Sequence, residues 1–302
     1  MKKILITALI ILAGLYALPQ QVPLYSQYMH NGFLLNPGIA GTETYVPIRL
    51  MGRKQWWGIE DSPQTFALSA HTLLKNQKMG LGGFIYNDMF GPVSSTGLQV
   101  SYAYHLDITT TTRLGMGISA SAFQYKMDTR DFIVLDEGKD DPMLQGGVES
   151  TFVPDANFGL YLYHHKFFVA LSAMQILQLN INLGDQKSKG MVRHYFAYTG
   201  YKFKLSEEYA IEPSGLIKTT ERTQIQADAN LKVYYKEDYW GGFSYRHLDA
   251  VIIMAGMKYK KMIFGVSYDY TMSKLKQFTF GSTEIVIGYN LFEGTGAGSS
   301  IL

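Results

Sequence analysis

The chain has 302 residues, of which 47% are apolar and only 17% charged, and its formal net charge at pH 7 is +2. Charged residues make up about 25% of a typical soluble protein, and the near-balanced charge gives no concentrated basic face of the kind that binds nucleic acid. The sequence contains no cysteine, which excludes disulfides, thiolate metal sites, cysteine nucleophiles and the acylated N-terminal cysteine of a bacterial lipoprotein.

Residues 1–20 have the pattern of a secretory signal peptide. A lysine pair is followed by the apolar stretch Ile4 to Leu15 and by small residues near Ala17, the usual order of such signals. A permanent N-terminal anchor is the alternative, but the stretch is shorter than the about 20 residues that a spanning helix needs. We predict cleavage between Ala17 and Gln21 and no transmembrane helix in the mature chain.

The next segment, residues 21–43, is too long and too patterned for a simple tail. We predict a periplasmic plug or docking segment that folds into the mouth of the following domain through Tyr25, Tyr28, Met29, Phe33 and Leu34. Asn36-Pro37-Gly38 has the residue types of a turn, and an ordinary turn is its alternative interpretation.

From residue 44 onward, apolar and polar residues alternate with the period of two that is typical of strands. Between 224 and 235 one face carries Leu231 and Val233 and the other carries Asn230 and Lys232, and the ranges 98–105, 114–121 and 261–270 repeat the pattern. The polar face holds mainly Gly, Ser, Gln and Asn, whereas a soluble sandwich would commonly carry many charges outside. The alternation therefore predicts a transmembrane barrel with its apolar face toward lipid, closed so that every backbone group is paired.

The expected strands make residues 44–302 one all-β, antiparallel outer-membrane barrel of about 14 strands, an even number as in bacterial barrels. They begin near Tyr45, Gln64, Met79, Thr96, Thr112, Asn157, Lys166, His194, Glu208, Gln224, Tyr239, Ala250, Lys261 and Ser282. Long connections (53–63, 87–95, 125–155, 175–193 and 271–281) alternate with short turns. Long loops normally lie outside the cell, which predicts that both termini are periplasmic and that Trp56 and Trp57 lie outside.

Several motifs are similar to those of the PorP/SprF family of outer-membrane proteins in the type IX secretion system of Bacteroidetes. The family's opening resembles Gln27-Tyr28-Met29-His30-Asn31 with Leu35-Asn36-Pro37 and Ala40-Gly41, and its next block resembles Arg53, Gln55-Trp56, Gly58 and Ser62-Pro63-Gln64-Thr65. Later matches are Asn87-Asp88, Gly91-Pro92, Pro154-Asp155, Glu212-Pro213, Tyr245-Arg246 and Tyr268-Asp269-Tyr270. Gly38, where alanine is usual, and the doubled Trp57 are small departures.

The resemblance implies an integral outer-membrane component that supports export or surface anchoring of particular large adhesins and, in relatives, gliding motility. It implies as partners the periplasmic ring and peptidoglycan-associated lipoproteins of the secretion system, and an exported adhesin or its C-terminal domain. Outer-membrane lipids would surround the barrel. A general diffusion porin or small-solute transporter is the alternative from a different functional class.

Candidate partner-binding residues fall on the rim and in the N-terminal segment. Exposed Trp and Arg are common binding hot spots, although an aromatic belt at the membrane boundary is the simpler interpretation of the two tryptophans. The hypothetical partner-binding set is Tyr28, Asn36, Pro37, Arg53, Gln55, Trp56, Trp57 and Asp88.

The remaining polar residues give little sign of catalysis or metal binding. Asp228, Asn230, Lys232, Arg246 and Asp269 should face the lumen, either as a salt-bridged interior or as a selectivity lining. The acidic group from Asp136 to Asp141 matches no calcium-loop motif, and adjacent residues such as His164 and His165 point to opposite faces of a strand. No catalytic motif stands out, so we expect binding rather than enzymatic activity, without a cofactor.

Overall fold

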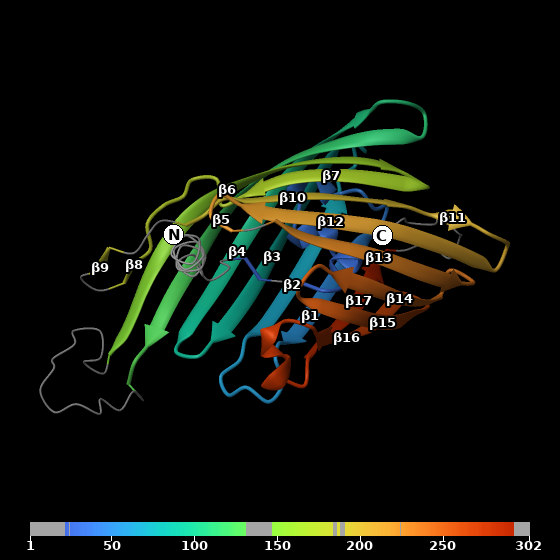
Figure 1. Cartoon of the computed structure of the whole chain (residues 1–302). Helices are drawn as coiled ribbons and strands as arrows, with labels where there is room; N and C mark the ends of the chain where they lie inside the picture. The colour runs from blue at the N-terminus through green and yellow to red at the C-terminus, as the bar shows by residue number, and fades with distance from the viewer. Residues whose placement is uncertain are drawn as a thin grey trace, which may run out of the picture.

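The computed structural model describes residues 22–23, 25–130, 147–183, 186–187, 191–223 and 225–292. These residues form a closed, antiparallel barrel of fourteen strands, drawn in Figure 1. Each strand pairs with its neighbour along the chain, and the first strand, β1, pairs with the last, β17. The predicted fold class and strand number are therefore confirmed. None of the described helices is both long and apolar enough to cross a bilayer.

The barrel strands are β1 (Val46–Lys54), β2 (Gln64–Leu73), β3 (Met79–Phe90), β4 (Val93–Asp107), β5 (Thr112–Asp128), β6 (Val148–His164), β7 (Phe167–Met174), β10 (His194–Tyr201), β12 (Tyr209–Thr220), β13 (Gln226–Tyr235), β14 (Tyr239–Arg246), β15 (Ala250–Tyr259), β16 (Met262–Thr271) and β17 (Ser282–Leu291). The two-residue strand β11 (Phe203–Lys204) pairs with the start of β12, and β8 (Asn182–Leu183) and β9 (Gln186–Lys187) form a small separate hairpin.

The two faces of each strand are divided as the alternation predicts. On β13, Asn230 and Lys232 are buried inside, whereas Leu231 and Val233 are 47% and 43% exposed on the outside. The same division holds on β4, β5 and β16. Because the exposed face is apolar and the enclosed face polar, the barrel is built for a hydrocarbon surrounding.

Two predicted loops are shorter in the structure than the sequence suggested. Residues 87–95 are not a long loop, because β3 continues to Phe90, β4 begins at Val93, and only Gly91 and Pro92 turn the chain. The long connection predicted for 125–155 is also mostly strand at its ends, since β5 extends to Asp128 and β6 begins at Val148. Both β5 and β6 have 17 residues, more than the about 9–11 that cross a bilayer. These strands therefore continue beyond the membrane, where a polar composition resembles a loop.

The barrel has two distinct ends. We call the end with the connections 55–63, 91–92, 129–147, 175–193, 221–225, 247–249 and 272–281 the long-loop mouth, and the opposite end the short-turn mouth. The connection 272–281 contains the short helix η5 (Lys274–Gln277). Lys54 of β1 pairs with Thr283 at the long-loop mouth, and Val46 pairs with Leu291 at the short-turn mouth. The described chain thus finishes, at Phe292, beside the short turns.

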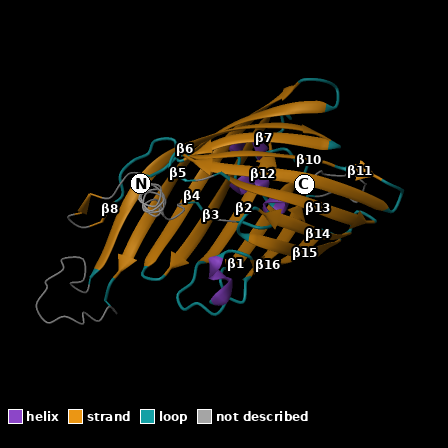
Figure 2. Cartoon of the chain, viewed as in Figure 1, coloured by secondary structure: helices purple, strands orange, loops and turns teal. Residues whose placement is uncertain are grey.

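Residues 25–41, which we call the lumen segment, lie inside the barrel. They form three short 3₁₀ helices, η1 (Tyr28–His30), η2 (Gly32–Leu34) and η3 (Pro37–Ile39), which Figure 2 shows in purple within the ring of strands. Phe33, Asn36 and Ile39 are each no more than 1% exposed. The segment is enclosed in the core of the molecule.

The lumen segment runs from the long-loop mouth to the short-turn mouth. Val22 and Pro23 line a cavity together with Trp56 and Leu248 of the long-loop mouth, whereas Gly41 contacts Thr72 and Gly80 beside a short turn. The described chain therefore enters at one mouth and finishes at the other, while the two termini themselves, and with them the prediction that both are periplasmic, lie outside the described residues. Alternation along a strand predicts which side chains face the lumen. It does not predict in which direction a segment inside the barrel runs. The predicted signal peptide, residues 1–20, is outside the described residues.

Candidate functional site

The lumen segment is fastened near the long-loop mouth by a charged anchor. The backbone N–H groups of Ser26 and Gln27 donate to the two carboxylate oxygens of Glu284, each at 2.7 Å. The Ser26 hydroxyl donates to Asp269 Oδ2 at 2.6 Å and accepts from Arg53 Nη1 at 2.7 Å. The anchor therefore joins the segment to β1, β16 and β17 through bonds that involve charged groups, which are stronger than neutral ones.

Two buried arginines complete this anchor. Arg53 lies 2.8 Å from Asp269 and 3.3 Å from Glu284. Arg246 lies 3.1 Å from Asp228 and 3.4 Å from Asp269. These side chains are almost completely enclosed, at 0–3% exposure, so removing one partner would leave a buried charge uncompensated.

Other lumen-facing residues pair in the same manner. Lys232 lies 2.8 Å from Glu212 and donates to the Tyr234 hydroxyl at the same distance. The five residues predicted to face the lumen are all buried there, and four of them are ion-paired. The fifth, Asn230, donates to the Tyr28 hydroxyl at 2.6 Å. Within the described residues these contacts match the salt-bridged interior rather than a water-exposed selectivity lining.

The middle of the lumen segment is held by aromatic and amide contacts. His30 stacks on Trp240 with 4.0 Å between ring centroids, and Asn31 Nδ2 donates to Ser69 Oγ at 2.9 Å. His30 as a residue is only partly buried, but its Nε2 is shielded from solvent and has no partner among the described residues. Burial, reinforced by the charges of Lys232 and Arg49, lowers the pKa of His30 well below its ordinary value of 6.5. The ring is therefore neutral when the segment is in place.

Near the short-turn mouth the segment is held by close backbone packing. Asn36 Nδ2 donates to the carbonyl oxygens of Leu160 and Leu171, at 2.9 and 3.1 Å, on the neighbouring strands β6 and β7. The backbone of Pro37 and Gly38 rests on Gly117, where an added Cβ would lie 2.3 Å from Gly38 N. Gly115 and Gly159 border the same contact, and an added Cβ there would lie 2.3 Å and 2.0 Å from the segment. These three glycines form a cradle for the lumen segment, because any larger residue would place a Cβ where the segment lies.

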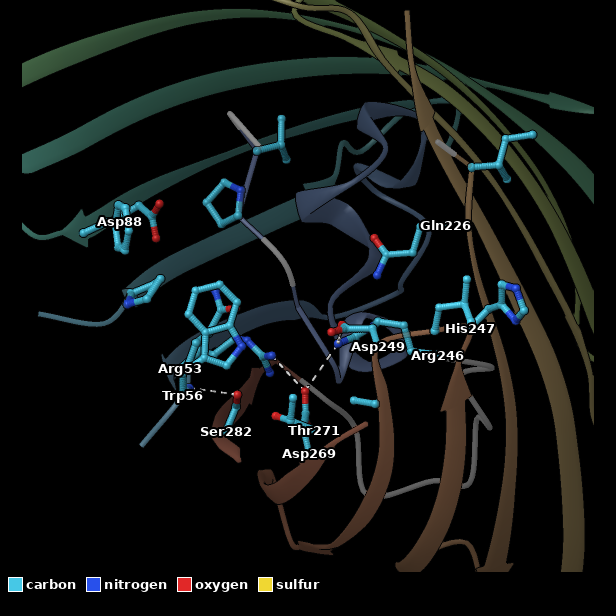
Figure 3. Close-up of a pocket in the computed structure, with 18 residues that line it drawn as sticks. Arg53, Trp56, Asp88, Gln226, Arg246, His247, Asp249, Asp269, Thr271 and Ser282 are labelled. Carbon is cyan, nitrogen blue, oxygen red and sulfur yellow. Dashed lines mark hydrogen bonds and ion pairs between the residues drawn. The ribbon is translucent and has the colours of Figure 1, made fainter. Parts of the chain in front are cut away.

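A cavity of about 520 Å³ lies above the anchor at the long-loop mouth. Figure 3 shows Arg53, Arg246 and Asp269 at its base and Trp56, Asp88 and Asp249 around it. Apolar wall residues also line it, namely Val22, Phe90, Ile225 and Leu248. At the other end of the segment a cavity of only about 20 Å³ is present.

The candidate partner-binding residues do not form one surface. Tyr28, Asn36, Pro37 and Arg53 are buried and hold the lumen segment in place. Gln55, Trp56 and Asp88 line the mouth cavity. Trp57 is 46% exposed and donates from Nε1 to Thr283 Oγ1 at 2.9 Å. Tyr28, Asn36 and Pro37 cannot touch a partner while the segment is docked, whereas Arg53 also lines the base of the cavity.

Trp56 adopts a backbone conformation that is rare for a bulky residue. Its φ is +48°, in the left-handed region that residues other than glycine rarely adopt. Its N–H donates to Ser282 Oγ at 3.1 Å, and the residue lines the cavity. The aromatic-belt interpretation therefore suits Trp57 better than Trp56.

Sequence reasoning missed residues that complete the site. Ser26 and Glu284 form the centre of the anchor, and Gly115, Gly117 and Gly159 form the cradle. The available signal was the position of the three glycines on lumen faces, where a missing side chain can mark a close backbone approach. The acidic group at 136–141 lies outside the described residues. His164 ends β6 and His165 begins the short turn, where their ring centroids lie 3.7 Å apart instead of on opposite faces of a strand. No described group of His, Asp or Glu is arranged to hold a metal ion.

Comparison with known proteins identifies the family. The profile described as type IX secretion system membrane protein PorP/SprF matches residues 17–289. This chain is a member of the PorP/SprF family. The PorP/SprF profile covers the strands that build the barrel and also the lumen segment, so the sequence resemblance is confirmed. No curated relative matches the chain.

The barrel fold of this PorP/SprF chain is also found in a solved channel structure. The CymD monoaromatic hydrocarbon channel is similar, with a TM-score of 0.51, 12% identity and coverage of 90% of this chain and 94% of that one. The P. putida toluene transporter TodX has a TM-score of 0.49 and 10% identity, with coverage of 86% of this chain and 93% of that one. Acinetobacter baumannii Omp33 has a TM-score of 0.47 and 9% identity, with coverage of 83% of this chain and 100% of that one. At such low identity CymD supports the barrel fold alone. The family is one of secretion-system membrane proteins, and CymD is a membrane channel.

Proposed function

We propose that this PorP/SprF protein supports the export or surface anchoring of specific large adhesins, and that it acts by binding partners rather than by conduction or catalysis. The observation that carries this proposal is the lumen segment. Its backbone and side chains contact β1 and β17 at one mouth and β5, β6 and β7 at the other. A barrel filled by its own chain is suited to be a docking platform and unsuited to be the conduit for a folded adhesin.

The proposal assigns the two mouths to different partners. We place the long-loop mouth outside the cell, as is usual for such barrels, where Gln55, Trp56, Trp57 and Asp88 would meet the exported adhesin or its C-terminal domain. The periplasmic ring and peptidoglycan-associated lipoproteins would approach the short-turn mouth. Tyr28, Asn36, Pro37 and Arg53 would act indirectly, by holding the lumen segment that links the two mouths. Outer-membrane lipids would cover the apolar outer face.

The test is mass spectrometry of the cell surface and culture fluid from a deletion strain and its parent. The proposal expects one or a few large proteins to disappear from outside while other exported proteins stay. Restoring the wild-type chain should return them. Loss of every exported protein would instead make the barrel a core part of the machinery, and an unchanged set would contradict the proposal.

A diffusion porin is the second candidate, favoured by the open mouth cavity. Single-channel recording in planar bilayers separates the two functions. We expect the full-length barrel to remain closed and a deletion of Pro23–Asn36 to raise its conductance, because the segment would no longer fill the lumen. Steady conductance of the full-length protein would favour the porin, and an equally closed deletion variant would dismiss the lumen segment as a plug.

A further inference from the structure

The mouth cavity and its base contain more carboxyl groups than cations. Asp88, Asp249 and Asp269 line it with Arg53 and Arg246. Directly behind them, Glu284 pairs with Arg53, Asp228 pairs with Arg246, and Lys218 interacts electrostatically with Asp228. The cavity and the side chains directly behind it therefore hold five carboxyl groups and three cations. This formal excess of negative charge favours a cationic occupant.

A buried carboxylate oxygen supports this inference independently. Asp269 Oδ2 accepts from Ser26, Arg53 and Arg246, but Oδ1 has no partner among the described residues although the side chain is only 2% exposed. A buried acceptor without a donor costs about 1–3 kcal/mol, so a donor is expected beside it. Asp269 stands at the base of the cavity (Figure 3), so the mouth is the side from which a donor would approach it.

The dimensions and walls of the cavity indicate more than a bound water. Its volume of about 520 Å³ lies within the range of about 300–1,000 Å³ found for ligand sites. Trp56, Phe90 and Leu248 supply apolar wall. A lysine or arginine side chain combines the required properties, because its stem packs on apolar surface while its head stays charged, and an indole ring also attracts cations.

We propose that the mouth cavity binds a lysine or arginine side chain of an exported polypeptide, with the cationic head at Asp269 and the alkyl stem between Trp56 and Leu248. The preference for a cation follows from the cavity itself. Only the choice of an exported polypeptide as its carrier rests on the proposed function. Because Asp269 also holds Ser26, an occupant would contact the same carboxylate that anchors the lumen segment.

The test uses the purified full-length chain in detergent with a single cysteine, Pro23→Cys, in the cavity wall. The native sequence has no cysteine, so N-ethylmaleimide reports on this position alone. n-Butylammonium, which is the lysine side chain, and n-propylguanidinium, which is the arginine side chain, should slow the modification in a saturable manner. Butanol and butanoate should not. Equal protection by butanoate, or none by either cation, would overturn the proposal.

Charge variants at the rim test the electrostatic part while keeping the hydrogen bonds of Ser26 and the ion pairs of Arg53, although Asp249 also lies 3.5 Å from Arg246. Asp88→Asn combined with Asp249→Asn should raise the Kd for n-butylammonium about tenfold, the loss expected for charge-assisted contacts. The matched control is Asp238→Asn, an exposed carboxylate in a turn at the opposite mouth, which should leave the Kd unchanged. An unchanged Kd in the double variant would contradict the role assigned to the acidic excess.

Cells distinguish failure of this site from failure of the proposed function. In cells that carry the double variant, we expect a selective decrease of the proteins that the deletion strain loses from its surface. If n-butylammonium binds the purified protein but the deletion strain exports normally, the site stands and the proposed function falls. If the deletion strain loses its adhesins but the cations fail to protect Pro23→Cys, the function stands and the site falls.

Discussion

The two ends of the lumen segment are held by different kinds of interaction. At the short-turn mouth Pro37 and Gly38 rest on a cradle of glycines, and Asn36 bonds to backbone carbonyls. At the long-loop mouth Ser26 sits among buried arginines and carboxylates, below an open cavity. Close packing is insensitive to salt and ligands, whereas a charged anchor responds to any ion that competes for it. The short-turn end of the lumen segment is therefore held by contacts that ions do not affect, whereas the hold on the long-loop end can be changed by competing ions.

The largest effect is expected from Arg53→Met. Losing the guanidinium leaves Asp269 and Glu284 underpaired in a buried site, and breaking one side of a buried ion pair costs about 3–5 kcal/mol. Single cysteines at Pro23 and at Thr42, which lies just beyond the short-turn end of the lumen segment, report on the two mouths separately. The maleimide reaction should become faster at Pro23→Cys but not at Thr42→Cys.

The control for this prediction is Lys236→Met, which removes one partner of an exposed pair with Glu208. Exposed pairs contribute little, so neither cysteine should change its reactivity. If Arg53→Met also left the Pro23→Cys rate unchanged, the charged anchor would not be what fastens this end.

Gly117→Ala should produce the opposite asymmetry. The added Cβ would lie 2.3 Å from Gly38 N and from Pro37 C, so the backbone of the lumen segment must shift, and overpacking of this kind costs about 1–3 kcal/mol. Thr42→Cys should then react faster while Pro23→Cys keeps its rate. Gly241→Ala is the matched control, because its Cβ would meet nothing closer than 3.9 Å. Equal acceleration at both cysteines would show that the two ends are not independent.

The smallest effect is a pH dependence that arises from His30, between the two ends. Its pKa in the docked segment lies well below the ordinary 6.5 because of burial and nearby Lys232 and Arg49, so a displaced, hydrated segment takes up a proton more readily than the docked one. The contribution to docking is complete above pH 6.5 and decreases as the pH falls below it, by at most about 1.4 kcal/mol per pH unit.

Conductance or cysteine reactivity, measured between pH 7.5 and 5.5, would report this dependence. Its slope should correspond to the uptake of about one proton when the lumen segment is displaced. His30→Phe keeps a ring to stack on Trp240 but cannot be protonated. It should show a flatter profile than the wild-type chain over that interval. A wild-type profile that is already flat would contradict a neutral His30 whose Nε2 is shielded from solvent.

The sequence predicts the barrel well because alternation with a period of two is a local property. Leu231 and Lys232 occupy opposite faces as soon as the strand forms, and the strand starts at Gln64, Met79, Thr112, Tyr239 and Ala250 agree with the structure. The prediction failed where strands leave the bilayer. The start of β6 at Val148 carries polar residues such as Glu149 and Ser150, which look like a loop when no lipid enforces alternation.

The candidate site was harder to predict because its contacts join distant parts of the chain. Arg53 and Asp269 were each singled out, but 216 positions separate them, and Ser26 is 258 positions from Glu284. A pattern shows that a residue faces the lumen without showing which residue lies opposite. The direction of the lumen segment was hidden for the same reason, since it depends on these partners and on the glycine cradle.

The anchor also has a consequence for assembly. The seam of the barrel is the pairing of β1 with β17, and the Glu284 carboxylate on the last strand binds both Arg53 of the first strand and the backbone of Ser26 and Gln27. Contacts so distant in sequence form late, since loop-closure entropy opposes them. The seam and the hold on the lumen segment therefore depend on the same late contacts of Glu284. The last strand closes the barrel and binds the lumen segment through the same carboxylate, so barrel closure is coupled to filling of the lumen.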